Sequence, residues 1–543
     1  MKKYVYSSLL ALFCFSADAN TDQPKLVVQI VIDQLRGDLI QQHQQQFGKA
    51  GFNYLLSHAI NYRNTHHPHA NTTTCAGHAT IATGSYPAMH GIVNNDWYDR
   101  KSKQMIYCME DKKVSTVPTQ HTKIPTPGRS PRNLYASTLS DEVVLAKKGR
   151  SFGVSLKDRS AIALAGHAGK AFWFDTTNGG FVTSTYYYKK YPLWVQKWNK
   201  IYRSPDYDWN LSRPKTEYQN AHSPVFTQVD QAFGQNFPHH VQHGENLDYF
   251  KALSRTPKAD QLTANFAEKL IVAEHLGSTA QKTDYLGISF SGVDAIGHQF
   301  GPNSLEAEDN LLILDKTLAH LLAVIDKQVG LDNTLIVLSA DHGVNDGPAY
   351  LKAHQIVEIK PINIGELEKF IHTALQKRFE LPEQALLAVT PPYIYLNHKL
   401  IHQNKLHLSE VSNYLAQALT LKPGIFKAFS LPIKQMENDW LSNKVNRMYY
   451  PNRAGDIYIV QPPNQSNGAK NISRVTHGSP WSYDSYVPLL FVHPSFKAQN
   501  ITRRVYTTNI ASTLAALLMI KEPSASVGHP LKEVINAAEH LSS

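Results

Sequence analysis

Three short apolar segments, each leading into an aspartate, constrain the fold of this chain most strongly. They are rich in β-branched and aromatic residues, which is typical of buried strands. The segments with their aspartates are residues 27–32 with Asp33, 285–290 with Asp294, and 334–340 with Asp341. In an open α/β sheet the carboxyl ends of the strands line one crevice, where ligands bind. The sequence therefore predicts an α/β fold with a mostly parallel central sheet sandwiched by helices, and a polar site at this edge.

Histidines accompany these aspartates. His342 directly follows Asp341, His298 lies four residues after Asp294, and His477 lies far downstream. Carboxylate and imidazole form a usual donor set for zinc or another borderline divalent ion, and six such ligands are enough for two ions. The chain has 26 histidines, so a single one such as His477 is more often a surface or core residue than a ligand. The histidine-rich tract 66–69 is predicted to be a polar loop without a role.

A hydroxyl-rich turn at residues 71–80 runs into small residues and predicts a capped helix start. A hydroxyl at that position faces unpaired backbone N–H groups and the positive end of the helix dipole, which would favour an alkoxide or a bound phosphate. A plain helix cap is the alternative. A nearby metal ion favours the chemical role, because metal coordination is one way to activate a threonine hydroxyl.

Two basic residues, Lys157 and Arg159, follow the strand-like segment 151–156. If this segment continues in extended conformation, both side chains project to the same side. A solvated basic edge is the alternative interpretation. A phosphate monoester carries one more charged oxygen than a diester, so two fixed cations, one of them a guanidinium suited to phosphate, favour monoesters as substrates.

The order of these residues resembles that of the alkaline phosphatase superfamily, and particularly of its type I phosphodiesterase/nucleotide pyrophosphatase branch. The matching positions are Asp33, Thr74, His78, Asn95, Asp294, His298, Asp341, His342 and His477. Within this branch, residues 155–161 resemble the signature of PafA-like bacterial alkaline phosphatases with a threonine nucleophile. The resemblance covers nearly the whole chain and implies an alkaline phosphatase-like sheet with cap insertions.

The resemblance also implies two zinc ions per chain and the role of each site residue. One ion would be held by Asp33, Asp341, His342 and the Thr74 oxygen, and the other by Asp294, His298 and His477. Thr74 would form a covalent phosphothreonine, while Asn95, Lys157 and Arg159 would contact the transferred phosphoryl group. The implied activity is hydrolysis of phosphate monoesters. A phosphodiesterase or nucleotide pyrophosphatase of the same fold is the main alternative, and a non-catalytic phosphate-binding relative is a more distant one.

The predicted organisation is a signal peptide followed by one discontinuous catalytic domain. Residues 1–19 combine a basic start, an apolar stretch and a cleavage motif before Asn20, which indicates a periplasmic or secreted protein of a Gram-negative bacterium. In the catalytic domain, residues 20–543, we expect cap insertions at about 96–260 and about 360–440, because the ligands themselves span residues 33 to 477. Cys75 and Cys108 could form a disulfide or remain two free thiols.

The formal net charge of +10 favours acidic substrates and would help to steer small phosphate esters to the site. No basic run is interleaved with aromatic residues, so we expect no nucleic-acid binding. Beyond the first residues, no segment approaches the roughly 20 apolar residues that span a membrane, so we expect no stable membrane insertion. A monomer is the favoured oligomeric state.

Overall fold

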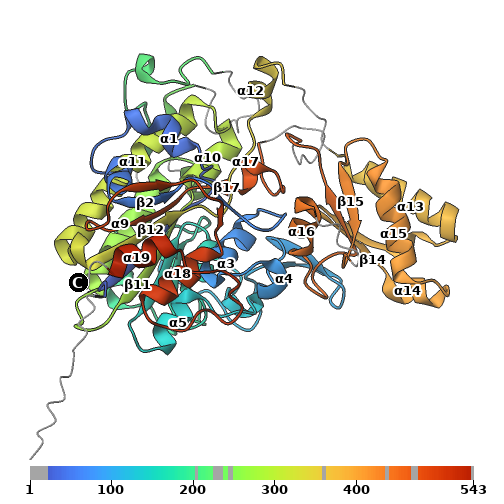
Figure 1. Ribbon diagram of the computed structural model, residues 1–543, viewed down its shortest axis with the longest axis horizontal. Coiled ribbons are helices and arrows are strands. Elements are labelled where there is room, and N and C mark those ends of the chain that lie inside the picture. Colours follow the sequence, from blue (N-terminus) through green and yellow to red (C-terminus); the bar gives the residue numbers. More distant parts are fainter. Residues whose placement is uncertain are drawn as a thin grey trace, which may run out of the picture.

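A nine-stranded sheet forms the centre of the protein (Figure 1). The computed structural model describes residues 23–201, 206–223, 236–242, 249–356, 362–433, 439–465 and 475–539. The strands, in spatial order, are β19 (Gln499–Ile501), β2 (Ala59–Tyr62), β18 (Leu489–Val492), β12 (Thr334–Ser339), β1 (Leu26–Ile32), β11 (Asp284–Phe290), β6 (Ser151–Ser155), β7 (Lys170–Phe174) and β8 (Phe181–Val182).

The five central strands, from β12 to β7, run parallel. Antiparallel strands flank them, since β18 pairs with β12 and β8 pairs with β7. In register, Ile32 lies opposite Phe290 and Val31 lies opposite Ser339, so β1, β11 and β12 end at nearly the same level. The predicted mostly parallel α/β sheet is confirmed, and its strand ends bring distant parts of the sequence to one edge.

Helices cover both faces of this sheet, which is why β1 is buried along its whole length and apolar except at Gln29. Val28 and Ile30 pack into the core on one face, whereas Val27 and Val31 pack into the core on the other. The helices of the first face include α2 (Phe52–Ser57), α9 (Lys258–Ala273) and α11 (Leu305–Gln328). Those of the second include α3 (Thr74–Thr83), α5 (Leu139–Leu145), α6 (Asp158–Ala165) and α18 (Asn509–Leu517).

A smaller sheet with its own helices lies on the right in Figure 1. Its strands, in order, are β13 (Leu386–Thr390), β14 (Tyr393–Leu396), β16 (Ile457–Val460) and β15 (Lys427–Ser430). Its helices are α13 (Ile364–Phe379), α14 (His398–Gln403) and α15 (Leu408–Thr420). The predicted insertion at about 360–440 ends too early for this unit, because β16 pairs with both β14 and β15.

The predicted cap at about 96–260 also needs correction. Within this range, strands β6, β7 and β8 belong to the central sheet, because β6 pairs in parallel with both β11 and β7, and β8 pairs with β7. The aromatic run 172–174, which was expected in the cap, lies in β7 and is buried. The parts of the range that lie outside the central sheet include the hairpin β4 (Asp96–Asp99) and β5 (Gln104–Tyr107), the pair β9 (Tyr207–Trp209) and β10 (His239–Val241), and the helices α7 (Leu193–Ile201) and α8 (Tyr249–Leu253).

Shorter elements complete the described chain. A three-stranded sheet consists of β17 (Tyr486–Val487), β3 (Thr65–His66) and β20 (Val505–Tyr506). Further helices are α1 (Leu39–His43), α4 (Pro87–His90), α10 (Gly292–Phe300), α12 (Pro348–Ala353), α16 (Trp440–Asn446), α17 (Ser482–Ser485) and α19 (Lys532–Glu539).

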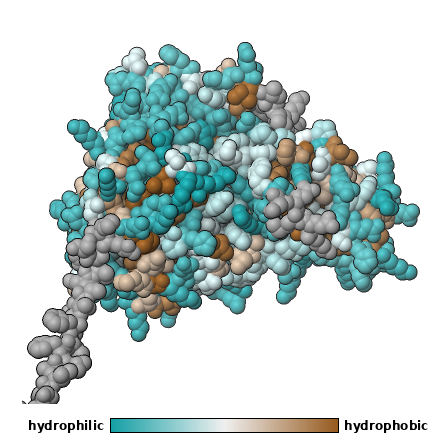
Figure 2. Space-filling view, viewed as in Figure 1, coloured by the Kyte–Doolittle hydropathy of each residue, from teal (hydrophilic) through white to brown (hydrophobic). Residues whose placement is uncertain are grey.

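The predicted signal peptide, residues 1–19, lies outside the described residues. Within the described part of the chain, no helix combines the length and the apolar character needed to cross a membrane. On the face seen in Figure 2, hydrophobic side chains form scattered spots among hydrophilic ones rather than one continuous area.

Candidate active site

Three buried aspartates lie together at the carboxyl ends of the central strands. Asp33 directly follows β1, Asp341 lies two residues after β12, and Asp294 lies in the first turn of α10, just after β11. With the predicted histidines they form two groups, namely Asp33, Asp341 and His342, and Asp294, His298 and His477. Within each group the ligand atoms lie within 4.8 Å of one another, so each group could hold one metal ion.

Each of the three histidines is oriented by a backbone carbonyl at its Nδ1 atom. The distances are 2.9 Å from His342 to Gly343, 2.9 Å from His298 to Val475, and 2.8 Å from His477 to Thr72. If Nδ1 carries the proton in each ring, the Nε2 lone pair is directed at the carboxylates. In His298, for example, Nε2 lies 3.1 Å from Asp294. Burial would lower the pKa of His298, but Asp294 raises it at this distance. Metal-ligating histidines are usually held by a carbonyl at Nδ1 in this way.

The charges and pKa values of the site also favour a bound cation in each group. Burial, and then the neighbouring carboxylates of Asp294 and Asp341, raise the pKa of Asp33. Its Oδ1 atom is buried and accepts no hydrogen bond within the described structure. Burial lowers the pKa of both His342 and His477, which keeps these imidazoles in the neutral form that binds metals. The donor set therefore fits a divalent cation in each group.

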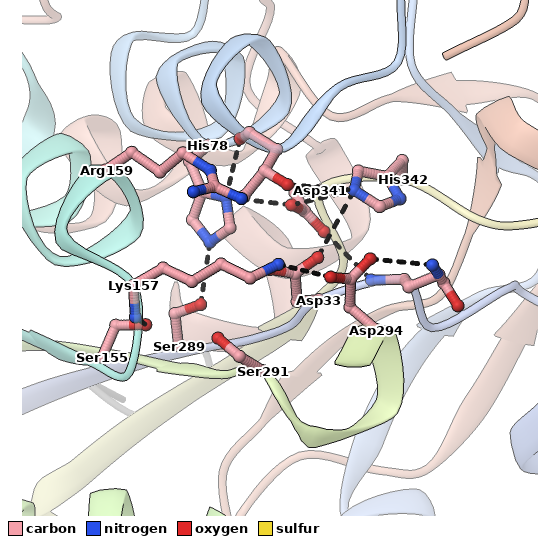
Figure 3. A network of polar contacts seen from close by, with 12 residues as sticks. Asp33, His78, Ser155, Lys157, Arg159, Ser289, Ser291, Asp294, Asp341 and His342 are labelled. Atoms are coloured by element: carbon pink, nitrogen blue, oxygen red, sulfur yellow. Dashed lines mark hydrogen bonds and ion pairs between the residues drawn. The ribbon is translucent and has the colours of Figure 1, made fainter. Parts of the chain in front are cut away.

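Lys157 links the two groups. Its Nζ atom lies 2.6 Å from Asp33 and 2.5 Å from Asp294, and Figure 3 shows the side chain extending between these carboxylates. Burial alone would lower the pKa of Lys157, but Asp294 and Asp33 raise it, so the side chain stays charged. An ammonium group therefore lies where the two candidate metal groups meet.

The predicted helix start is confirmed, with Thr73 as N-cap and Thr74 as the first residue of α3. The Thr73 side chain makes no capping hydrogen bond. The hydroxyl oxygen of Thr74 is buried and lies 3.5 Å from Nε2 of His342. Thr74 therefore lies beside the first metal group and at the positive end of a helix, where an anion is favoured.

Asn95 is tied to the same helix start. Its side-chain oxygen accepts a 2.9 Å hydrogen bond from the backbone N–H of Cys75, the neighbour of Thr74. Its backbone carbonyl accepts a 2.8 Å hydrogen bond from the N–H of Cys108, and Cys75 and Cys108 form a disulfide. Of the two states left open by the sequence, the structure therefore has the paired one. The disulfide and Asn95 together connect the start of α3 to the β4–β5 hairpin.

The sequence that forms this site matches a known protein family. The family model of type I phosphodiesterase / nucleotide pyrophosphatase matches residues 27–480. The chain belongs to this family. The match includes all seven candidate metal ligands, namely Asp33, Thr74, Asp294, His298, Asp341, His342 and His477.

Two proteins that resemble this chain over nearly its whole length are named alkaline phosphatases. The chain is 34% identical over 531 residues to alkaline phosphatase PafA of Elizabethkingia meningoseptica, covering 94% of this chain and 95% of that protein. It is 33% identical over 565 residues to alkaline phosphatase PhoV of Synechococcus elongatus, covering 98% of this chain and 99% of that protein. These matches confirm the resemblance seen in the sequence.

The crystal structure of PafA confirms the fold, with a TM-score of 0.84 and 32% identity over 94% of this chain and 99% of that one. A further structure, with a TM-score of 0.83, is of a PafA variant substituted at a threonine, an asparagine, a lysine and an arginine. The spacing of those four positions equals the spacing of Thr74, Asn95, Lys157 and Arg159.

In this member of the family, Lys157 and Arg159 do not lie together on an extended segment, so this prediction is wrong. β6 ends at Ser155, Lys157 is the N-cap of α6, and Arg159 is the second residue of that helix. Burial opposes the charge of Arg159, but Tyr107 and Asp158 raise its pKa above the ordinary value, so it remains a cation. Both cations nevertheless lie at the end of a central strand, beside the metal groups.

Several residues that shape the site were not predicted to have a role. Gln34 donates its backbone N–H to Asp341 and its side-chain amide to Asp294, at 3.2 Å and 2.7 Å. His78 lies 3.1 Å from Asp341. Asp260, on α9, accepts two 2.9 Å hydrogen bonds from the backbone N–H groups of residues 291 and 292, at the start of α10. No sequence pattern marks Gln34 or Asp260, because their contacts are with residues distant in the chain.

The tract 66–69 is also not a polar loop. His66 lies in β3, and His66, His67 and His69 are all buried. His67 Nε2 lies 2.9 Å from the backbone carbonyl of Ala340, immediately before Asp341. Burial lowers the pKa of His67 to about 4, so it is a neutral support behind the candidate metal ligand Asp341.

Proposed function

We propose that this chain is a metal-dependent phosphate monoester hydrolase of the alkaline phosphatase type. The observation that carries the proposal is the pair of carboxylate–histidine groups on either side of Lys157, next to a threonine at a helix start. The names of PafA and PhoV support it, since both are alkaline phosphatases that match over nearly the whole chain.

We propose two zinc ions per chain. Asp33, Asp341, His342 and the Thr74 oxygen would hold one, and Asp294, His298 and His477 would hold the other. Nitrogen and oxygen donors without cysteine are compatible with zinc. When bound, a pair of such ions supplies charge stabilisation for the attacking and the leaving oxygen of an in-line displacement.

The side chains of the site account for the remaining chemistry. The Thr74 oxygen attacks phosphorus, forming a phosphothreonine bond while the bond from phosphorus to the leaving alcohol oxygen breaks. Water then attacks phosphorus, and the Thr74 oxygen departs to restore the hydroxyl. The N-terminus of α3, which begins at Thr74, favours the negative charge of the bound phosphoryl group.

Asn95, Lys157 and Arg159 are proposed to bind the phosphoryl oxygens. The PafA variant described above supports these roles, because it carries substitutions of the same four residue types at the same spacing. Phosphoryl transfer depends mainly on positioning and on neutralising the equatorial oxygens, which two cations and an amide can provide. A guanidinium can bind two phosphate oxygens at once, so Arg159 is suited to the doubly charged monoester.

The alternative is a phosphodiesterase, which the family description includes. Turnover of an aryl phosphate monoester compared with its methyl diester separates the two activities. We expect kcat/KM for the monoester to exceed that for the diester by orders of magnitude, because the diester lacks the charge that Lys157 and Arg159 bind. A preference for the diester would assign the chain to the phosphodiesterases instead.

We further propose that the protein acts in the periplasm or outside the cell, as a monomer, on small phosphate esters. The disulfide between Cys75 and Cys108 supports the location, since disulfides persist in oxidising compartments. Cell fractionation tests the location, and recovery of the activity in the cytoplasmic fraction would contradict it.

A further inference from the structure

A large cavity opens from the candidate active site. Its volume is about 730 Å³, within the usual range for small-molecule sites, and its walls include Lys157, Arg159 and the metal-group residue His298. Thr74 is not among the residues that line it. A second cavity touches the site at Thr73 and His477, but its volume is only about 80 Å³. The larger cavity is therefore the one with room for the part of a substrate beyond the phosphoryl group.

In-line displacement supports this placement. The attacking and leaving oxygens lie on opposite sides of phosphorus. If Thr74 attacks from the side of α3, the leaving group points away from Thr74, past the phosphoryl-binding cations. Lys157, Arg159 and His298 line the cavity, whereas Thr74 does not. We therefore expect the leaving group of a phosphate monoester to lie in the cavity.

The charged side chains of this cavity are mainly cationic. Its lining contains five basic side chains, Arg129, Lys157, Arg159, Lys251 and Arg255, and two carboxylates, Asp158 and Asp175. Both carboxylates have partners. Asp158 accepts a 2.6 Å hydrogen bond from Arg129, and Asp175 accepts hydrogen bonds from the backbone N–H groups of residues 177 and 178 and from the side chain of Asn178.

Among these cations, Lys251 is a candidate for binding the leaving group, because it lies on α8 and not at the start of α6 with Lys157 and Arg159. It is exposed and lines the cavity. Among the residues that the structure describes, no carboxylate forms an ion pair with Lys251. Its charge is therefore available to an anion that enters the cavity. Since Lys157 and Arg159 bind the phosphoryl group, Lys251 would meet a second anionic group on the same substrate.

We propose that the enzyme prefers phosphate monoesters whose leaving group carries a second negative charge, such as a carboxylate or a second phosphate, and that Lys251 is a specificity-determining residue for that charge. The proposal rests on the proposed phosphomonoesterase function. It concerns only the discrimination between leaving groups, and it leaves the chemistry at phosphorus unchanged.

Two substrates of matched shape test it: para-carboxyphenyl phosphate and its neutral amide analogue, para-carbamoylphenyl phosphate. The ratio of their kcat/KM values is compared between the zinc-loaded wild type and Lys251→Met, so that differences in leaving-group reactivity cancel. We expect Lys251→Met to lower the ratio about two- to fivefold through loss of turnover of the carboxylate, the size expected of one solvent-screened charge contact. Lys251→Glu should lower the ratio further, and added salt should lower it in the wild type.

The matched control is Lys369→Met, which removes an exposed lysine on α13, outside the cavity lining. It should leave the ratio unchanged. An unchanged ratio in Lys251→Met and Lys251→Glu, with both substrates still hydrolysed, would overturn the inference and leave the proposed function standing. Equal loss of the ratio in Lys369→Met would also overturn it, because the effect would then be one of net charge. Failure of the wild type to hydrolyse either monoester would instead contradict the proposed function.

Discussion

The Nζ atom of Lys157 lies 2.6 Å from a carboxylate oxygen of Asp33. This ion pair crosses β11, because Asp33 follows β1 and Lys157 follows β6, and β11 lies between those strands. The contact places a cation that the family resemblance assigns to phosphoryl binding directly against a candidate metal ligand. Lys157 therefore belongs to both parts of the site, and it offsets part of the charge of the buried aspartates.

Thr74→Ala should lower turnover by about three orders of magnitude or more, because it removes the group that forms the covalent intermediate. The fold should persist, since the substitution removes few atoms. The matched control is Thr73→Ala, whose side chain makes no capping hydrogen bond. Trapping the phosphoenzyme and mapping it by mass spectrometry checks the assignment, and a phosphate on any other residue would refute it.

Elemental analysis should find two zinc ions per chain, and a chelator should abolish activity. Asp294→Ala and His477→Ala should each lose about one ion, because these side chains belong to one group and do not ligate in the other. His69→Ala provides a comparison, since this buried histidine belongs to neither group. A fully active enzyme with a single ion would rule out the two-metal account.

Cys108→Ser should destabilise the protein and reduce turnover together. Opening the 33-residue separation of the disulfide removes a constraint worth on the order of 3–4 kcal/mol in the unfolded chain. It also frees the hairpin that carries Asn95 from the start of α3. Urea denaturation and kcat measure the two effects, and mild reduction of the wild type should reproduce both. Unchanged stability and turnover would mean that the disulfide does not hold the site.

Glu533→Gln should show a stability loss that depends on pH. The hydrogen bond from Arg503 lowers the pKa of Glu533 from its ordinary 4.5 to about 2. A lowered carboxylate pKa stabilises the folded state above the unfolded pKa, and this contribution disappears as the pH falls through the folded pKa. Because the pair is partly exposed, we expect a loss of about 1 kcal/mol at neutral pH.

Urea denaturation at several pH values measures this difference relative to the wild type. The difference should shrink between pH 4.5 and about 2, over the range in which Glu533 becomes protonated. A difference that stays constant down to the acid end would show that the carboxylate charge is not responsible.

The parts of the fold and site that could be predicted from the sequence are those that depend on patterns of neighbouring residues. The apolar runs before Asp33, Asp294 and Asp341 reveal buried parallel strands, and such strands bring their ends to one edge. The helix start within residues 71–80 could be predicted for the same reason, because a hydroxyl-rich turn before small residues marks a helix start. In each case a stretch of neighbouring residues carried the information. The choice of Thr74 among the hydroxyls of this turn came from the family resemblance.

The remaining features depend on contacts between distant segments. His477 lies in a loop that is held to the site by the Thr72 carbonyl, 405 residues earlier in the chain, and no local pattern distinguishes it from other histidines. The disulfide depends on how the β4–β5 hairpin packs against α3. The cap boundary was misplaced because β6 and β7 lie within the predicted cap range, and only their pairing with β11 and with each other assigns them to the central sheet.

Lys157 and Arg159 are the residues proposed to make this chain a monoesterase. The most direct measurement is kcat/KM of the double variant Lys157→Ala with Arg159→Ala on an aryl phosphate monoester and on its methyl diester. Charge-assisted contacts contribute about 1.5–3 kcal/mol each, so the monoester should lose about two to four orders of magnitude. The diester lacks the extra charge and should lose much less, while Lys189→Ala with Lys190→Ala, which removes two exposed cations elsewhere, should change neither. Equal losses on both substrates would contradict the account and favour the phosphodiesterase alternative.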